Sequence, residues 1–285
     1  MRPILLISTE LGVGGAEKGL VEIALRLPKH GYAPTVVSLQ PRPAPPRDAL
    51  VTRLESAGVR VHFLDLAGWR QLPSAVGRLQ RLMRETKTPL ALSFLFHANV
   101  VTAWAARRCR VRHWAGVRVA DPQGWRNWIE AKALGRCEEV ICVSERVRRH
   151  FGRYFRDAER LTVIPNGVSP FPSMAAADLT RIGVGEEAKV VLFIGRLHPQ
   201  KGLMEALPAV GRALEENPDA HFVLVGDGPQ RDALARAALK LPCAERVHFL
   251  GFQQEVGPYL KRARCLLLPS QWEGMPNVVL EAMAA

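Results

Sequence analysis

The segment Glu273–Glu281 offers the most specific chemistry in the chain, because two glutamates flank the sequence Gly-Met-Pro-Asn-Val-Val-Leu. Pro276 suits the first position of a helix, so we expect a helix at 276–284. Glu273 then lies in the loop before this helix, and Glu281 lies on the helix itself. Exposed N–H groups at a helix start suit phosphate, and carboxylates suit pairs of sugar hydroxyls. The alternative is a charge at a helix start and a second charge on a solvated face.

Two cations follow a strand-like segment earlier in the same half of the chain. Arg196 leaves the expected strand at 190–195, and Lys201 stands at the start of the next expected helix. A forked guanidinium and an ammonium that converge on one anion meet the needs of a diphosphate. A solvated basic turn is the alternative, since arginine and lysine are usually exposed.

The chain also has a glycine-rich turn near its start, where Gly12, Gly14 and Gly15 connect an expected strand to an expected helix. Glycine lets backbone N–H groups approach a ligand, and a helix start favours negative charge. The turn lacks the Lys-Ser/Thr ending of a P-loop, and no ribose-binding acid follows the second strand as in a dinucleotide fingerprint. Contact with an anion is the favoured interpretation, and a tight strand-to-helix turn is the alternative.

Secondary-structure elements must position these residues, and the hydrophobic pattern indicates which elements they are. Short apolar runs alternate with amphipathic stretches along the whole chain. The runs are continuous rather than alternating, which is typical of parallel strands buried on both faces. We expect strands at 3–8, 33–39, 59–64, 90–96, 111–117, 139–144, 161–165, 190–195, 221–226, 247–251 and 265–269. We expect helices at 16–30, 71–86, 98–108, 125–136, 145–155, 202–216, 230–241 and 276–284.

The alternation pauses at Asn166–Pro172, where proline and glycine are dense, and this composition predicts a connection between domains. Two βαβ arrays predict an α/β protein with two Rossmann-like, doubly wound domains that face a cleft. We place these domains at 1–172 and 173–285. We expect the second domain to be incomplete at its C-terminus, because it is much shorter than the first and stops inside its last expected helix.

The composition narrows the class of protein. The chain has 285 residues, of which 48% are hydrophobic, and this content excludes disorder as the dominant state. No apolar run approaches the roughly 18 residues of a membrane-spanning helix. The five cysteines form no Cys-x-x-Cys pair, so we expect neither a disulfide framework nor a zinc site, and we expect a cytoplasmic location. The net charge of +12 attracts phosphates, nucleic acid or anionic lipid without selecting among them.

The first half of the chain combines basic and aromatic residues that suit an anionic membrane surface. The arginines are Arg146, Arg148, Arg149, Arg153, Arg156 and Arg160, and the tryptophans are Trp104, Trp114, Trp125 and Trp128. Arginines on a helix can lie against lipid headgroups while tryptophans enter the interface. We therefore keep a peripheral location on the inner face of the membrane as a hypothesis, with an ordinary solvated basic face as the alternative.

Six segments in this order resemble the retaining glycosyltransferases of family 4, which have the GT-B fold. The segments are Gly14–Glu17, Val163–Val168, Phe193–Leu197, Val225–Pro229, Phe249–Phe252 and Glu273–Glu281. The resemblance covers nearly all of the chain. It implies transfer of a sugar, with retention, from a nucleotide diphosphate donor to a lipid-linked or saccharide acceptor. It favours a UDP-sugar over a GDP-sugar, needs no cofactor or metal, and suits bacterial polysaccharide or envelope glycolipid assembly.

The resemblance also implies roles for individual residues. Arg196 and Lys201 are similar to the pair that neutralises the diphosphate. Glu273 is similar to the family's residue that holds the transferred sugar, and Glu281 to the one that binds the ribose hydroxyls. His97 falls where the family often presents a histidine to the donor sugar, although many relatives have another histidine where this chain has Phe94. The alternative for His97 is a histidine at a strand end that bonds to backbone.

The remaining expected contacts with the donor involve backbone. By resemblance, Gly14 and Gly15 meet the donor phosphate, and the turn Leu250-Gly251-Phe252 contacts the base. The set expected to contact the donor also includes Gly195, Met275, Pro276 and Asn277. The helix start at Met275–Asn277 joins the two cations in stabilising the departing diphosphate, which is consistent with the absence of an Asp-x-Asp cation site.

Other functions stay open at this stage. A nucleotide-sugar-binding protein without transferase activity is one alternative, and a nucleotide-sugar epimerase of similar fold is another. A nucleic-acid-binding protein would explain the positive charge, but no RNA- or DNA-reading motif is present, so we expect no nucleic-acid partner. Our working mechanism is a front-face substitution in which the leaving phosphate accepts the proton of the acceptor hydroxyl.

Overall fold

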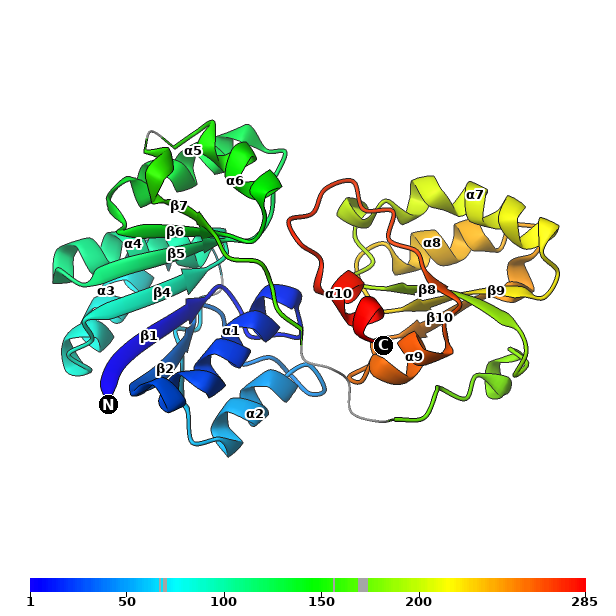
Figure 1. Cartoon of the computed structure of the whole chain (residues 1–285), viewed down its shortest axis with the longest axis horizontal. Coiled ribbons are helices and arrows are strands. Elements are labelled where there is room, and N and C mark those ends of the chain that lie inside the picture. The colour runs from blue at the N-terminus through cyan, green and yellow to red at the C-terminus, as the bar shows by residue number, and fades with distance from the viewer. Residues whose placement is uncertain (67, 69–70, 156, 169–173) are drawn as a thin grey trace. The chain divides into compact units, whose positions relative to one another are not determined.

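The computed structural model describes residues 1–66, 68, 71–155, 157–168 and 174–285, and the chain divides into two compact units (Figure 1). Unit 1 is Met1–Asn166 and unit 2 is Gly167–Ala285. The expected domain boundary between 172 and 173 and most of the expected connection lie outside the described residues, so that boundary stays a prediction.

Unit 1 is built on a seven-stranded parallel sheet with the order β3-β2-β1-β4-β5-β6-β7. Its strands are β1 Arg2–Ser8, β2 Tyr32–Ser38, β3 Arg60–Phe63, β4 Leu90–Phe94, β5 Arg112–Val117, β6 Glu139–Cys142 and β7 Leu161–Val163. Its helices are α1 Gly15–Arg26, α2 Ala49–Ser56, α3 Leu72–Glu85, α4 Phe96–Cys109, α5 Gly124–Ala133 and α6 Glu145–Gly152. The chain winds outward from β1 to β3 and then returns to the other side of β1, which creates a switch point between β1 and β4.

Both faces of this sheet are buried, and β1 shows why its sequence is apolar without interruption. Leu5 and Ile7 pack into a core with residues of α3 and α4, whereas Ile4 and Leu6 pack into a core with residues of α1 and α2. Figure 1 shows these helix pairs on opposite faces of the sheet. Successive side chains of a strand point to opposite faces, so a strand between two helical layers must be apolar at every position.

Unit 2 repeats the plan with a four-stranded parallel sheet of order β10-β9-β8-β11. Its strands are β8 Lys189–Ile194, β9 Ala220–Val225, β10 Val247–Gly251 and β11 Cys265–Leu266. Its helices are α7 Leu203–Glu216, α8 Arg231–Ala238, α9 Gly257–Arg262 and α10 Asn277–Ala284. Side chains of α7 and α8 share one core with the sheet, and those of α9 and α10 share the other. Single 3₁₀ turns join the elements: η1 Leu27–His30, η3 Leu134–Arg136, η4 Ala158–Arg160, η5 Thr180–Ile182, η6 Pro199–Lys201 and η7 Ala244–Arg246.

The predicted α/β class with two parallel sheets is confirmed, and every expected strand is present. Two short helices, α2 and α9, were not predicted. The expected helix at 16–30 ends as η1 instead, since Pro28 cannot continue the α-helical hydrogen bonds. In the parts of the chain that the structure describes, every helix falls short of the length and apolar character that crossing a membrane requires.

Candidate functional site

The carboxyl ends of the strands of unit 2 bring most of the predicted donor residues to one edge of its sheet. The backbones of the turns after β8, β9 and β10 pack directly on one another. Gly195 N donates to Val225 O at 3.0 Å, and Gly226 N donates to Gly251 O at 2.7 Å. A Cβ at Gly226, where φ is +137°, would lie 1.9 Å from Gly195 O. Only glycine fits this position, so the turns are held rigidly by backbone contact.

A lysine and a glutamate from two of these turns meet at that edge. Lys201 Nζ lies 2.5 Å from Glu273 Oε1, and the two side chains are 17% and 21% exposed. Lys201 ends η6, after β8, and Glu273 lies in the loop after β11. Since β8 and β11 are neighbouring parallel strands, their carboxyl ends are adjacent. The structure therefore brings together two residues that the sequence places 72 positions apart.

Residues that the sequence analysis did not single out connect the same two turns. Gln200 O accepts a hydrogen bond from Gln271 N at 2.9 Å, and Gln200 Nε2 donates to Trp272 O at 2.9 Å. Gly202 has a φ of +64°, and a Cβ there would lie 2.3 Å from Pro269 O. A glycine between Lys201 and an apolar helix was the one signal in the sequence, because helices often begin or end at such a residue.

The turn after β8 is electrically positive. His198 Nδ1 accepts a hydrogen bond from Gln200 N at 3.2 Å. Burial lowers the pKa of His198, and the positive charges of Arg196 and Lys201 lower it further. Arg196 itself is exposed. The neutral form of the imidazole is therefore favoured near these two cations, and the exposed guanidinium of Arg196 adds a positive charge to the turn.

The other predicted donor residues of unit 2 lie after β10 and at the start of α10. Leu250 O accepts a hydrogen bond from Gln253 Nε2 at 3.0 Å, and Phe252 is half-buried. Pro276 is the residue that precedes α10 rather than its first residue, a shift of one position. Met275 and Asn277 flank it, and Glu281 lies half-buried in the second turn of the helix.

Unit 1 holds the rest of the predicted site residues, at the switch point of its sheet. Gly14 precedes α1 and Gly15 is its first residue, whereas His97 lies in the first turn of α4. The preceding strands β1 and β4 are neighbours, and Ala98 N donates to Thr9 Oγ1 across them at 3.4 Å. Desolvation lowers the pKa of His97, as does the charge of Arg126. The glycine turn and the histidine thus belong to the same edge of unit 1.

The structure corrects part of the predicted basic surface. Arg148 and Arg149 pair with Glu145 of their own helix. Arg160 donates to the carbonyl oxygens of Cys137 and Gly135 and so fixes local structure. Because these guanidinium groups already have partners, the run is weaker as a lipid-binding surface than its charge suggests.

One tryptophan of that predicted surface is also engaged within unit 1, and one of its arginines is not described. Trp114 lies half-buried on β5, and its indole N–H donates to Glu138 Oε2 at 3.2 Å. Arg156 lies outside the described residues. Among the four tryptophans singled out from the sequence, Trp104, Trp125 and Trp128 are exposed.

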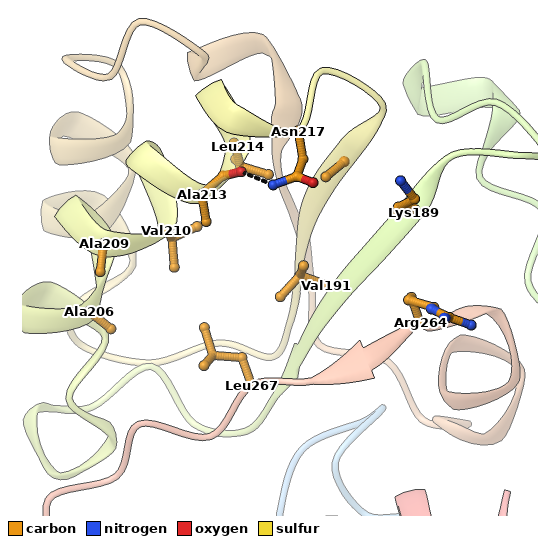
Figure 2. Close-up of a pocket in the computed structure, with 11 residues that line it drawn as sticks. Lys189, Val191, Ala206, Ala209, Val210, Ala213, Leu214, Asn217, Arg264 and Leu267 are labelled. Carbon is orange, nitrogen blue, oxygen red and sulfur yellow. Dashed lines mark hydrogen bonds between the residues drawn. The ribbon is translucent and has the colours of Figure 1, made fainter.

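A pocket in unit 2 lies away from these residues. It has a volume of about 420 Å³ and is lined mainly by the apolar side of α7 and by β8, with Lys189 and Arg264 among its lining residues (Figure 2). Asn217 closes the end of α7 there by donating to Ala213 O at 2.8 Å. None of the predicted donor residues lines it. The candidate site is therefore defined by the strand-end turns and not by this pocket.

Each of the two units matches a known protein family. Residues 13–170 match the family described as Glycosyltransferase Family 4. Residues 188–285 match the family described as Glycosyl transferases group 1. The two matches together cover every strand except β1, and they include all of the predicted site residues.

Two characterised relatives align with the chain over part of its length. UDP-Gal:alpha-D-GlcNAc-diphosphoundecaprenol alpha-1,3-galactosyltransferase of Escherichia coli is 31% identical over 166 residues, which are 55% of this chain and 43% of that protein. The 2-deoxystreptamine glucosyltransferase of Streptomyces kanamyceticus is also 31% identical over 166 residues, with the same shares of 55% and 43%. The aligned region therefore spans less than half the length of these relatives.

Solved structures match the whole chain. HepE from Anabaena in complex with UDP-glucose superposes with a TM-score of 0.82 at 23% identity, covering 100% of this chain and 78% of that one. Sucrose-phosphate synthase from Thermosynechococcus elongatus superposes with a TM-score of 0.80 at 19% identity, covering 99% of this chain and 79% of that one. At such identities the likeness establishes the fold.

Proposed function

This chain belongs to the retaining glycosyltransferases of family 4 and has the GT-B fold, and from that premise we propose that it transfers a hexose from a UDP-sugar to a lipid-linked or saccharide acceptor. The name of the Escherichia coli relative supports a lipid diphosphate acceptor, and the bound UDP-glucose of HepE supports uridine as the base. The setting that we propose is bacterial polysaccharide or envelope glycolipid assembly, on the cytoplasmic side.

The contact between Lys201 and Glu273 is the observation that carries this proposal. Both side chains are mostly buried, and each comes from a different strand-end turn, so their meeting is built by the fold. In the absence of donor the ammonium and the carboxylate satisfy each other. A bound donor offers both of them new partners, because its diphosphate suits the ammonium and its sugar hydroxyls suit the carboxylate.

The same residues supply what the chemical step requires. Cleavage of the bond between sugar and diphosphate leaves negative charge on the diphosphate while the sugar gains oxocarbenium character. Arg196 and Lys201 place positive charge where the diphosphate departs, and the N–H groups at the start of α10 add to it. The acceptor oxygen attacks the anomeric carbon from the face that the diphosphate leaves, and its proton passes to a diphosphate oxygen. This front-face substitution retains the configuration.

We assign binding of the acceptor to unit 1, and we propose that two segments of this unit also contact the donor. Gly14 N donates to Gly12 O at 3.0 Å, so we propose that the Gly14–Gly15 turn meets the donor phosphate through the positive start of α1 that it opens. His97, with a lowered pKa, is largely neutral at pH 7 and so has one ring nitrogen available to accept a hydrogen bond. A neutral ring suits contact with sugar hydroxyls rather than with a second phosphate.

We also propose that α5 contacts an anionic membrane surface. Trp125, Trp128 and Ile129 lie at helical spacing and are 62%, 55% and 37% exposed, whereas the opposite side of the helix is buried. Lys132 follows on the same side, with its ammonium 4.7 Å from the centre of the Trp128 ring. Tryptophans flanked by cations are typical of helices that lie in the headgroup region.

Vesicle sedimentation tests the membrane contact. We expect the chain to sediment with vesicles that contain phosphatidylglycerol at low salt, and added salt should release it. The double variant W125A/W128A should bind about tenfold more weakly, because each indole buries apolar area in the interface. L239A is the matched control, since Leu239 is an exposed apolar residue of unit 2. No sedimentation at low salt would remove this part of the proposal.

Product analysis tests the reaction itself. We expect the full chain to bind UDP in calorimetry and to release it from UDP-glucose or UDP-galactose only when an acceptor such as a GlcNAc-diphosphate lipid is present. Binding of UDP-sugar without release would favour a nucleotide-sugar-binding protein. Appearance of an epimeric sugar without acceptor would favour an epimerase. Binding of neither UDP nor the UDP-sugars would contradict the proposal.

A further inference from the structure

The turn between β4 and α4 carries backbone strain. Leu95 lies between the last residue of β4 and the first residue of α4, and it has a φ of +76° and a ψ of 151°. This region of backbone conformation is sterically costly for every residue except glycine, so it persists only where other contacts hold it. His97 follows two positions later, in the first turn of α4. The conformation of Leu95 therefore decides where the imidazole lies at the carboxyl edge of the sheet.

A buried asparagine connects the residues on the two sides of this turn. Asn99 lies near the start of α4 and is fully buried. Its Oδ1 accepts a hydrogen bond from Ser93 Oγ of β4 at 2.7 Å, and its backbone N–H donates to Leu95 O at 2.8 Å. Its Nδ2 donates to Gly116 O of β5 at 3.2 Å. One side chain thus ties the strand before the strained turn and the neighbouring strand to the helix after it.

A glutamate on another helix completes the hydrogen bonds of this asparagine. Asn99 Nδ2 donates to Glu130 Oε1 of α5 at 2.6 Å, although the two residues are 31 positions apart. Glu130 is only 7% exposed, so water cannot readily replace its oxygen as the acceptor. A buried N–H group that loses its acceptor is costly. The orientation of the Asn99 amide therefore depends on the side chain at position 130.

The proton positions in this cluster follow from the hydrogen-bond partners. Gly116 O and Glu130 Oε1 both accept from the amide nitrogen, so the amide oxygen faces Ser93 and the serine hydroxyl donates to it. Ser93 Oγ also lies 2.8 Å from His113 Nε2, and since the only hydrogen of the hydroxyl is already used, the ring nitrogen is the donor there. Burial lowers the pKa of His113 to about 3, so its ring is neutral with the proton on Nε2. Each polar group in the cluster therefore has one fixed role.

We propose that Asn99 and Glu130 are positioning residues that hold the strained turn at Leu95 and thereby fix His97 at the carboxyl edge of unit 1. The inference rests on the proposed function only in giving His97 a contact with the donor sugar. Asn99 and Glu130 themselves act through the backbone of the turn and not by touching the donor. Removal of the oxygen at position 130 should therefore loosen the start of α4.

Hydrogen exchange on the full chain without donor tests this role by comparing E130M with E130Q. Glutamine can still accept the hydrogen bond of Asn99, whereas methionine cannot. At pH 6, below the raised pKa of Glu130 of about 7, most of the glutamate is uncharged, so the two variants differ in the acceptor rather than in charge. Amides 98–101 should exchange at least about tenfold faster in E130M than in the wild type, and within about threefold of the wild type in E130Q. Equal exchange in E130M and E130Q would overturn the proposal.

Asn127 provides the matched control, because it is a second buried asparagine of α5. It is 2% exposed, and its Nδ2 donates to Asp121 O at 2.7 Å. N127L should speed exchange at amides 126–128 and leave amides 98–101 within about threefold of the wild type. If N127L speeds exchange at 98–101 as much as E130M does, any loosening of α5 has this effect, and the positioning role of Glu130 fails.

Glycine at position 95 tests the strain itself. Glycine adopts a φ of this sign without a steric penalty, so the network has less strain to hold in L95G. The factor by which E130M speeds exchange at 98–101 should fall from at least about tenfold in the wild-type background to less than about threefold in the L95G background. The same factor in both backgrounds would overturn the part of the proposal that concerns Leu95.

Turnover distinguishes this inference from the proposed function. If both hold, E130M lowers kcat/KM for UDP-glucose about tenfold in the wild-type background, and it changes kcat/KM by less than about twofold when H97A is already present. E130Q should keep most of the wild-type value. If H97A has wild-type turnover but E130M still loosens 98–101, the positioning role stands and the proposed role of His97 fails. If E130M lowers kcat/KM by the same factor with and without H97A, Glu130 does not act through His97 and the proposal is overturned.

Discussion

Unit 1 and unit 2 both place candidate site residues at the carboxyl edge of a parallel sheet, but they hold them by different means. In unit 2, backbone packs on backbone at Gly202, Gly226 and Gly228, where an added Cβ would lie within 2.4 Å of a carbonyl oxygen. In unit 1, a buried polar network next to His97 does this, where Asn99 accepts a hydrogen bond from Ser93 Oγ at 2.7 Å and donates one to the carboxylate of Glu130 at 2.6 Å. Steric positioning is independent of pH, whereas positioning by buried charge depends on protonation and on keeping both partners. Substitution of a glycine should therefore destabilise unit 2, whereas a change of pH should destabilise unit 1.

Replacing Gly226 by alanine should have the largest effect on stability. The new methyl would lie 1.9 Å from Gly195 O at a φ of +137°, so the turn after β8 or the turn after β9 must move. We expect unit 2 to lose about 3 kcal/mol, from overpacking together with backbone strain. Hydrogen exchange of the amides of β8 and β9, followed against urea concentration, measures this in unit 2.

Gly185 provides the control for that substitution. A Cβ there meets nothing within 4 Å, and its φ lies outside the positive range. G185A should therefore change stability by less than about 1 kcal/mol. Equal effects of G226A and G185A would show that close backbone contact is not what positions these turns.

Glu130 provides the corresponding test in unit 1. Asn99 Nδ2 donates to its carboxylate at 2.6 Å, yet burial raises the pKa of Glu130 to about 7. A pKa that is raised in the folded state gives stability at low pH that is lost as pH rises, here from about 4.5 through 7. We expect the wild type to lose on the order of 2–3 kcal/mol over this range from Glu130 alone.

The variant E130Q isolates that group. Glutamine keeps the shape of the glutamate side chain and carries no charge. The free energy of unfolding of E130Q should therefore vary less between pH 5 and pH 8 than that of the wild type. Urea titrations at both pH values measure the difference through tryptophan emission, which comes mainly from unit 1. If the free energy of unfolding changes between pH 5 and pH 8 by the same amount in E130Q as in the wild type, the pH dependence does not come from Glu130.

The smallest expected effect is a gain. Gly77 lies inside α3, where a Cβ meets nothing within 4 Å. G77A should stabilise unit 1 by about 0.5–1 kcal/mol, because alanine loses less backbone entropy than glycine in a helix. A shift of the thermal midpoint upward by a few degrees is the expected readout. No change would show that α3 does not limit the stability of this unit.

The strands could be predicted from the sequence, because buried parallel strands leave continuous apolar runs. The order of the site segments could be read from the sequence as well. Glu273 was also placed before a helix, with an error of one residue at Pro276. The contacts between segments that are distant in the sequence were not predicted. The bond of Gln200 to Trp272 spans 72 positions, and that of Arg118 to Asn166 spans 48. Spacing along a chain carries no information on which turns meet once the sheet has formed.

The arginine run shows what a count of charges leaves out. Its charge predicted a membrane surface, but a charge count does not show which side chains already have partners. Arg148 and Arg160 are engaged within unit 1, whereas the exposed indoles lie on other helices. The interpretation from composition was right that aromatic and basic residues gather in the first half of the chain. Which of them face solvent depends on the packing of α4 and α5.

Two lysine–carboxylate pairs of unit 2 allow a matched test of the central claim. Lys201 and Glu273 are mostly buried at the strand-end turns, whereas Lys189 and Asp219 pair at 3.0 Å with both side chains 54% exposed. If the first pair contacts the donor, its loss should remove stabilisation of the departing diphosphate, and loss of the second should not.

The most direct measurement is kcat/KM for the UDP-sugar in K201Q, E273Q and K189Q. The account predicts a fall of about 100-fold or more for K201Q and for E273Q. It predicts a value within about twofold of the wild type for K189Q, because exposed ion pairs contribute little. Wild-type turnover in K201Q and E273Q would contradict the claim that these turns hold the donor.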